Sequence, residues 1–234
     1  MFLMLKSRWK NKPSMIIVQK EGLMMSVIVA IKRDNKVYMG ADSQVTKGGS
    51  RRSLSNQNNY KIWKVKNVDH CLIGHVGNFR DACVIRIMKN LIDEIDVIKD
   101  NVNFEYVVDR ILPTIINELK RHHYINSDTK FDEMDSWFLF AYKDKLFIIS
   151  NEGSVIEIDD CIAIGSGEGE AIGSLLTTNT DDNPIERIIK AIKSSVAHDI
   201  YVNYPIIITD TDKTEFKTIN QDSLKECIAN NTIE

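Results

Sequence analysis

The chain has 234 residues, of which 43% are hydrophobic and 27% charged, with a formal net charge of −3 at pH 7. A chain of this length and composition can bury one substantial core, so we expect a single folded domain. The scattered charge argues against a nucleic acid or an anionic membrane surface as the partner, because both require a concentrated basic surface, and no apolar run approaches the roughly 20 residues that span a bilayer.

The first 25 residues have a different composition from the rest of the chain. They hold five of the eight methionines and five Lys or Arg against one Glu. Lys20–Gly22 can be encoded by a bacterial ribosome-binding sequence, and two methionines follow within a few codons. We therefore expect residues 1–25 to be either a wrongly assigned start, with translation beginning at Met25, or a propeptide that is cleaved after it. Both hypotheses give a mature domain over residues 26–234 that begins with Ser26.

A strand hairpin is predicted directly after Met25. Apolar residues run almost unbroken from Ser26 to Arg33, as in a strand that is covered on both faces. Asp34-Asn35 is a two-residue turn signal, and Lys36–Asp42 is the expected return strand. The polar segment Lys47–Asn59 is expected to be an exposed loop. Two further short strands are predicted at Lys61–Val65 and His70–Val76.

Helical periodicity characterises the next part of the chain. Apolar residues recur at three- and four-residue steps over Val84–Ile98 and again over Phe104–Leu119, which predicts two amphipathic helices. Pro113 lies inside the second pattern. It should kink or split that helix, because proline removes a backbone donor and clashes with the preceding turn.

The second half of the chain repeats the order of strands followed by helices. Strands are predicted at Trp137–Tyr142 and Leu146–Ser150 as a hairpin, at Val155–Ile158 and Ile162–Ile164 as a shorter pair, and at Tyr204–Thr209. Helices are predicted at Glu168–Thr177 and from Asn183 onward, where a cap residue precedes a proline. Since runs of strands are separated from pairs of helices, the pattern favours a layered α+β fold over alternating βαβ units.

Four short motifs follow one another along this framework. They are Ser26–Arg33 with Tyr38–Gln44, then Gly74–Gly77, Ala163–Gly167 and Ala197–Ile200. Together they resemble the proteasome β-subunit family of N-terminal-nucleophile hydrolases, and most of all its bacterial two-component relative. The resemblance extends from about Ser26 to Thr209. It implies a four-layer αββα sandwich, in which two antiparallel sheets lie between helical layers.

The resemblance makes Ser26 the nucleophile of the mature chain. A serine at a chain N-terminus can use its own α-amino group as general base, because that amine has an unperturbed pKa of roughly 7.7–8.0, close to working pH. Asp42 matches the acid that orients a catalytic lysine, and Lys61 matches that lysine. Because the loop before Lys61 is longer than in the bacterial relative, Lys64 is the alternative.

Three further positions complete the site that the resemblance implies. Gly77 matches the glycine whose backbone N–H stabilises the oxyanion, and Ser166 and Asp199 match the polar pair that supports the α-amino group. The chain departs from the family at its nucleophile, because Ser26 stands where threonine is commoner. The β-methyl group that restricts the hydroxyl rotamer is then missing, and we expect activity to survive this change.

No cofactor or metal is expected. The four cysteines and five histidines show no metal-ligand spacing, and free thiols in a reducing cytoplasm are favoured over disulfides. His75 and His198 lie beside site residues. This chemistry requires no histidine, so we interpret both as structural or substrate-lining.

The expected function is that of a cytoplasmic endopeptidase of the threonine-peptidase type, with Ser26 as nucleophile. The resemblance implies a homo-oligomeric ring that acts on peptides or unfolded protein, with an AAA+ unfoldase as candidate partner. Two alternatives remain open. The first is a catalytically silent proteasome-like structural subunit, favoured if residues 1–25 stay attached and bury Ser26. The second is a small-amide amidohydrolase, since one fold hosts several functions.

Overall fold

The computed structural model describes residues 25–47, 49–89, 91–93, 96, 100–122, 134–180 and 182–222. The expectations about residues 1–24 therefore lie outside the described residues, whereas Met25 and Ser26 lie within them. No helix in the described part of the chain is long and apolar enough to cross a membrane.

The first of two five-stranded antiparallel sheets contains the predicted N-terminal hairpin. Its strands, in the order β10-β1-β2-β11-β12, are Cys161–Gly165, Val27–Arg33, Lys36–Ala41, Ile206–Asp210 and Lys217–Ile219. Asp34 and Asn35 both have positive φ, 55° and 57°, which is the geometry of the two-residue turn that the sequence predicts between β1 and β2. Strand β12 had no counterpart in the sequence-based prediction.

The second sheet packs face to face against the first. Its strands, in the order β5-β6-β7-β8-β9, are Ile62–Lys64, Cys71–Gly77, Ser136–Tyr142, Lys145–Ile149 and Val155–Glu157. The predicted strand pair over Val155–Ile158 and Ile162–Ile164 is wrong in its pairing. Strand β9 pairs with β8, whereas β10 pairs with β1, so the chain crosses from one sheet to the other between these short strands.

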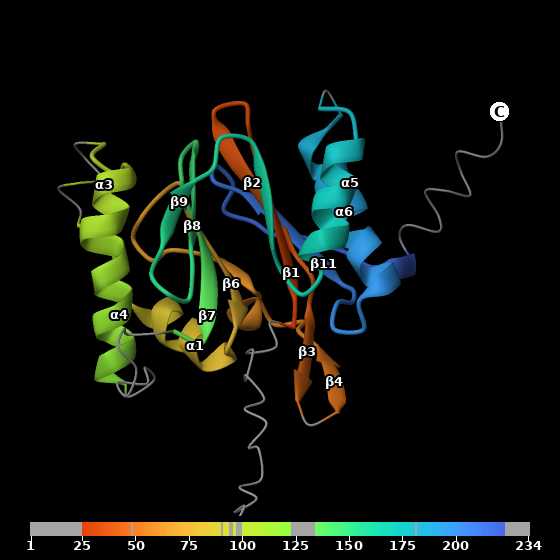
Figure 1. The fold of residues 1–234 in the computed structure, drawn as a ribbon, viewed down its shortest axis with the longest axis horizontal. Helices are drawn as coiled ribbons and strands as arrows, with labels where there is room; N and C mark the ends of the chain where they lie inside the picture. Colours follow the sequence, from red (N-terminus) through yellow and green to blue (C-terminus); the bar gives the residue numbers. More distant parts are fainter. Residues whose placement is uncertain are drawn as a thin grey trace, which may run out of the picture.

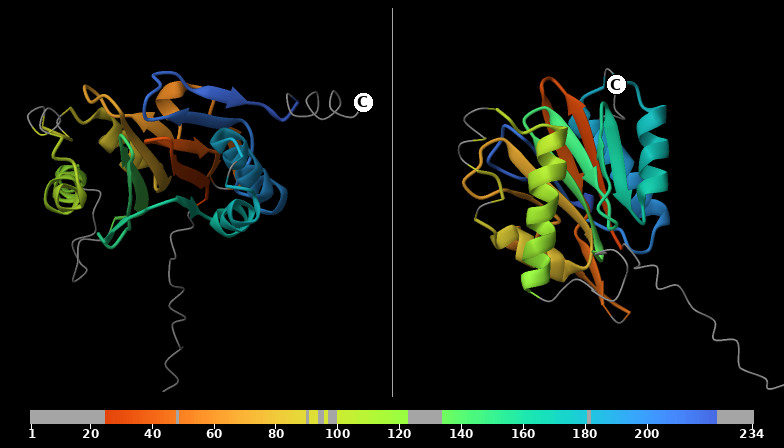
Figure 2. Two further views of the ribbon diagram at one scale, coloured as in Figure 1. Left: turned by 90° about the horizontal axis from the view of Figure 1, so that it is seen from above. Right: turned by 60° about the vertical axis from the view of Figure 1, so that its left-hand side comes forward.

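Helices cover the outer face of each sheet, which gives four layers (Figures 1 and 2). Helices α5 (Glu168–Thr177) and α6 (Pro184–His198) cover the first sheet, and α1 (Phe79–Ile87) with α4 (Leu112–Arg121) covers the second. The αββα sandwich is therefore confirmed.

Strand β1 shows how the sequence specifies the layers. Ile28 and Ala30 face the core between the two sheets, and Val27, Val29 and Ile31 face α5 and α6. Both faces are buried, because side chains alternate along a strand and this strand has a layer on each side.

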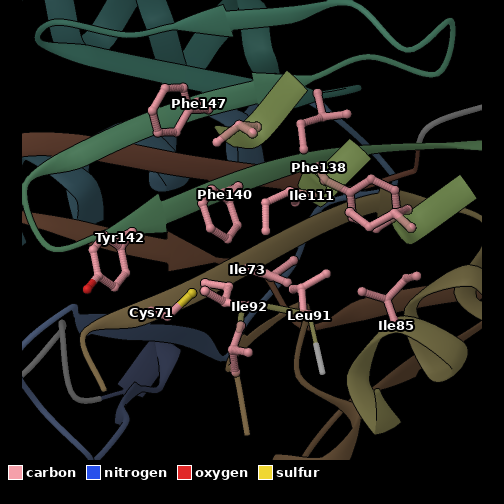
Figure 3. Packing of buried hydrophobic residues seen from close by; sticks show 14 of the residues in the cluster. Cys71, Ile73, Ile85, Leu91, Ile92, Ile111, Phe138, Phe140, Tyr142 and Phe147 are labelled. Carbon is pink, nitrogen blue, oxygen red and sulfur yellow. The ribbon is translucent and has the colours of Figure 1, made fainter. Parts of the chain in front are cut away.

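The second sheet packs against the other helical layer through large apolar side chains. Figure 3 shows Ile73, Phe138 and Phe140 of this sheet in one cluster with Ile85 of α1 and Ile111.

The helix predicted over Val84–Ile98 is interrupted after Ile87, and residues 90, 94, 95, 97 and 98 of that prediction lie outside the described residues. Helix α1 begins at Phe79, where the Asn78 side chain caps it, and it ends at Ile87 because Met88 adopts extended backbone (φ −59°, ψ 138°). Leu91 and Ile92 nevertheless pack into the same core cluster. The apolar periodicity after Ile87 therefore indicates residues that are buried in the core, and not a continuation of α1.

Pro113 interrupts the regular helix as predicted. The helical run consists of α3 (Phe104–Tyr106), a π-helical segment η2 (Val107–Ile111) and α4, and the N–H of Leu112 donates to the carbonyl of Val107, five residues back.

The segment Lys47–Asn59, predicted as an exposed loop, is largely exposed but contains regular secondary structure. Strands β3 (Gln44–Lys47) and β4 (Ser50–Ser53) form a separate hairpin, followed by the short 3-10 helix η1 (Gln57–Asn59). This hairpin extends from one end of the sandwich in Figure 1, at the end where β1 begins.

Candidate active site

Ser26 lies immediately before β1 and is only 5% exposed. Its backbone carbonyl accepts hydrogen bonds from the Gly167 N–H and the Ser166 hydroxyl, both at 3.3 Å. Gly165 has φ +109°, and a Cβ there would lie 2.2 Å from the Ser26 carbonyl oxygen. A glycine is therefore required at position 165 for the chain to pass this close to Ser26.

Met25 is joined to Ser26 in this chain, so the Ser26 nitrogen is a peptide nitrogen that occupies the place of the expected α-amine. It donates a hydrogen bond to the Ser166 hydroxyl at 3.2 Å. The Ser26 hydroxyl donates to the Met25 carbonyl. The structure thus brings the Ser166 hydroxyl to the Ser26 nitrogen.

Asp42 follows β2 and is the centre of a buried hydrogen-bond network. Its Oδ1 accepts from the Val27 N–H at 3.0 Å and from the Lys61 ammonium at 2.7 Å. Its Oδ2 accepts from the backbone N–H groups of Gln44, at 2.9 Å, and Asn203, at 3.3 Å. Three backbone segments and one side chain therefore converge on a single carboxylate at the start of β1.

Lys61, and not Lys64, is the lysine that contacts Asp42. The Lys61 side chain is 4% exposed, and its burial lowers the pKa of the ammonium, while the nearby Asp42 and Asp199 carboxylates act in the opposite direction. The Lys64 ammonium instead donates to the backbone carbonyls of Asp210 and Thr211.

Gly77 ends β6 with its N–H directed away from β7. The Asn78 N–H donates to the Asp135 carbonyl at 3.1 Å, so the facing residues Gly77 and Ser136 form a non-hydrogen-bonded pair. On the opposite edge of β6, the His75 N–H donates to the Lys61 carbonyl, and β5 starts at Ile62 without reaching the level of Gly77. This geometry leaves the Gly77 N–H beyond the end of β5.

Asp199 caps the C-terminus of α6. Its Oδ1 accepts from the Tyr201 N–H at 2.8 Å, and its buried Oδ2 has no hydrogen-bond partner within the described residues. Its charge acts on Lys61, which places the two groups in the same electrostatic environment. The neighbouring His198 is exposed and pairs with Glu170, away from this chemistry.

A cleft of about 790 Å³ adjoins these groups. It is lined by Ser26, Lys61 and Gly77 together with β3 and the first turn of α1. A different cavity, of about 590 Å³, lies between the β5–β6 turn and residues 211–216 and shares no lining residue with this cleft. The cleft at Ser26 combines a nucleophile, one member of a buried ion pair and a backbone donor.

Sequence reasoning missed several groups at this site. Asn203 contributes only its backbone N–H, which any residue except proline supplies, so no sequence signal identifies it. Gln44 ends the Tyr38–Gln44 motif, but the sequence predicts no role for it. Its side-chain amide donates to the Ile200 carbonyl at 2.8 Å, which connects β3 to the segment after α6. A buried set of polar side chains around Ser136, next to Gly77, was also missed.

Comparisons with known proteins agree with this fold. A family model described as proteasome subunit matches residues 25–209. The ATP-dependent protease subunit HslV of Caldicellulosiruptor saccharolyticus is 29% identical over 188 residues, which cover 79% of this chain and 97% of the relative.

Two solved structures share the architecture. The eukaryotic HslV from Trypanosoma brucei is 20% identical, with a TM-score of 0.56 over 79% of this chain and 98% of that one. A mutant of Anbu from Hyphomicrobium sp. strain MC1 is 14% identical, with a TM-score of 0.60 over 87% of this chain and 97% of that one. Because the family model covers most of its length, the chain belongs to the proteasome subunit family.

Proposed function

We propose that this chain is the peptidase subunit of a proteasome-like protease, with Ser26 as nucleophile and its α-amino group as base. The observation that carries the proposal is the buried Lys61–Asp42 pair, held at 2.7 Å at the start of β1 and lining, through Lys61, the same cleft as Ser26. The similarity to an ATP-dependent protease subunit supports peptide hydrolysis over the alternatives.

The reaction begins when the Ser26 hydroxyl attacks the carbonyl carbon of the scissile peptide bond. The free α-amine of Ser26 takes the hydroxyl proton and then delivers it to the nitrogen of the leaving amine. This step breaks the peptide C–N bond and leaves an ester on Ser26. Water then attacks the ester, the amine takes a proton from that water, and the hydroxyl is restored as the carboxylate product leaves.

Lys61 and Gly77 stabilise the charges that develop during this attack. A positive ammonium beside Ser26 lowers the pKa of the α-amine and favours the partly deprotonated hydroxyl, and Asp42 keeps that ammonium charged and oriented. The Gly77 N–H lies beyond the end of β5 and pairs with no strand among the described residues, so it is available to the oxyanion. One such donor contributes roughly 3 kcal/mol to transition-state stabilisation.

Ser166 and Asp199 support the α-amino group. The Ser166 hydroxyl already accepts from the Ser26 nitrogen at 3.2 Å in the uncleaved chain. When the amine takes a proton it gains donors that a peptide nitrogen lacks. The Asp199 Oδ2, which has no partner among the described residues, is a suitable acceptor for that ammonium.

The mechanism requires that residues 1–25 be absent from the mature enzyme, either because translation starts at Met25 and the methionine is removed or because a propeptide is cleaved. We further propose that the subunits form a homo-oligomeric ring in the cytoplasm and degrade peptides and unfolded protein supplied by an ATP-dependent unfoldase. A closed ring of heterologous contacts shields the hydrolytic site from folded proteins.

Hydrolysis of a fluorogenic peptide library, with the intact mass measured on the same sample, tests the proposal. We expect the active species to begin at Ser26, Ser26→Ala to lose turnover by orders of magnitude, and Ser26→Thr to remain active as the matched control. Full activity in material that retains Met25 would contradict the α-amine mechanism. Inactivity of the Ser26-initiated chain would favour the structural subunit, and hydrolysis restricted to small amides would favour the amidohydrolase.

A further inference from the structure

A fully buried hydroxyl faces Gly77 across the β6–β7 ladder. Ser136 is 0% exposed, and its Oγ lies 2.7 Å from Asp81 Oδ2, 3.0 Å from His75 Nε2 and 3.2 Å from the Asn78 backbone nitrogen. Asp81 belongs to the first turn of α1, and Ser136 begins β7. The hydroxyl therefore links two elements that meet directly beside the proposed oxyanion donor.

The proton on each of these groups follows from their chemistry. Burial and the nearby Arg86 guanidinium lower the pKa of His75 to about 3, so its imidazole is neutral near pH 7. Burial raises the pKa of Asp81 to about 6, which leaves it mainly a carboxylate at neutral pH. The Ser136 hydroxyl then donates its only proton to Asp81. Its two lone pairs accept from the Asn78 N–H and the His75 Nε2–H, so its hydrogen-bonding capacity is filled.

This hydroxyl helps to fix the backbone on the C-terminal side of Gly77. The Asn78 N–H is shared between Ser136 Oγ and the Asp135 carbonyl, and the Asn78 carbonyl accepts from the Asp81 N–H at 3.0 Å. Gly77 itself has φ +115°, and a Cβ at this position would lie 2.8 Å from Ser136 Cα. The peptide group after Gly77 is thus held in one orientation by Ser136 and by the start of α1. The Gly77 N–H belongs to the preceding peptide group, so Ser136 acts on it through the φ and ψ angles of Gly77.

We propose that Ser136, held by Asp81 and His75, is a positioning residue that aims the Gly77 N–H at the oxyanion of the reaction. The inference rests on the proposed function, in which Gly77 supplies that donor. Ser136 does not line the cleft at Ser26, so it acts through the Gly77–Asn78 backbone and not on the substrate. His75 does line the cleft and connects the buried network to its wall.

The test compares Ser136→Ala with Ser150→Ala in the mature, assembled enzyme. Ser150 is a matched control, because it is also a buried serine whose hydroxyl accepts a backbone N–H, that of Ser154 at 3.0 Å, but it does not line the cleft. A donor that is misdirected loses part of the roughly 10²–10³-fold effect of an oxyanion hydrogen bond. We expect kcat for a peptide substrate to fall about tenfold or more in Ser136→Ala, with KM within about twofold of wild type. Ser150→Ala should keep the wild-type kcat.

Three further measurements separate positioning from loss of fold. Asp81→Asn keeps an oxygen that can accept the Ser136 proton and should retain most of kcat, whereas Asp81→Ala should resemble Ser136→Ala. A peptide aldehyde, which forms an oxyanion on Ser26, should bind more weakly to Ser136→Ala in proportion to the fall in kcat/KM. Binding of an unreactive peptide of the same sequence to Ser26→Ala should be unaffected by adding Ser136→Ala.

The outcomes distinguish this inference from the function on which it rests. A folded Ser136→Ala or Asp81→Ala enzyme with kcat within twofold of Ser150→Ala would overturn the positioning role alone. If Ser136→Ala fails to assemble, Asp81→Ala and Asp81→Asn decide the question, and equal kcat in these two variants would overturn the role. A wild-type enzyme that begins at Ser26 and hydrolyses no peptide would overturn the proposed function and this inference with it.

Discussion

Replacement of Asp42 by asparagine tests how the site is held together. The Asp42 carboxylate accepts from three backbone N–H groups and from the Lys61 ammonium, and its side chain is 0% exposed. The asparagine side chain would keep one acceptor oxygen and would turn an N–H₂ group toward donors. The Lys61 ammonium, 4% exposed, would lose the carboxylate to which it donates and would remain buried.

The expected magnitude follows from which group is left unsatisfied. Removing one partner of a buried ion pair costs about 3–5 kcal/mol, because the other charge stays buried without compensation. Lys61→Met removes the ammonium instead and leaves a carboxylate that still accepts three backbone N–H groups. We therefore expect Asp42→Asn to lower the free energy of unfolding by about 3–5 kcal/mol and Lys61→Met by about 1–2 kcal/mol.

Urea denaturation at one fixed protein concentration measures both variants. The measurement is made in a Ser26→Ala background, which removes hydrolysis by the proposed nucleophile, and at equal subunit concentration, because assembly stabilises the folded state by mass action. The double variant should lose less than the sum of the two single losses. If Lys61→Met costs as much as Asp42→Asn, or if Asp42→Asn costs under about 1 kcal/mol, the assignment of Asp42 as the centre of the network is wrong.

Further outcomes follow from the site and the fold. Gly165→Ala should abolish hydrolysis, because its Cβ would lie 2.2 Å from the Ser26 carbonyl oxygen at φ +109°; wild-type activity would show that Ser26 does not need this position. Since His75 has a folded-state pKa near 3 against 6.5 for the free side chain, stability should fall as the pH drops from 6.5 toward 3. His75→Phe should make the urea midpoint less dependent on pH between 6.5 and 3. An unchanged slope would refute the lowered pKa of His75 as the cause of this pH dependence. Light scattering should report a ring, whereas an active species no heavier than the 26.8 kDa of one full-length chain would exclude it.

The sequence predicts the sandwich well where a simple period is present. The β1–β2 hairpin, the β7–β8 hairpin and both helices of the first sheet's layer follow from apolar patterning and from turn or cap residues. The strands β9 and β10 show the limit of this reasoning. Each was predicted as a strand, but local sequence carries no information about which sheet a short strand joins, since that choice depends on partners far away in the chain.

The site was predictable only in part for the same reason. A single residue such as Asp42 can be named from a motif, and the structure places it against Lys61. The groups that hold it are backbone N–H groups, which leave no trace in residue identity. The Ser136 network was missed because a serine, an aspartate and a histidine that are 55 and 61 residues apart along the chain form no sequence motif.

The contacts around Ser26 are already in place while Met25 is joined to it. The Ser26 carbonyl is held by Ser166 and Gly167, and the next N–H, that of Val27, is held by Asp42. None of these hydrogen bonds involves Met25 or the Ser26 nitrogen. Removal of the preceding residues therefore breaks the Met25–Ser26 peptide bond. It also frees the Ser26 hydroxyl from the Met25 carbonyl, while the surrounding donors and acceptors stay in place. Activity in the proposed mechanism is consequently controlled by the presence of a free amine on a site that is already organised.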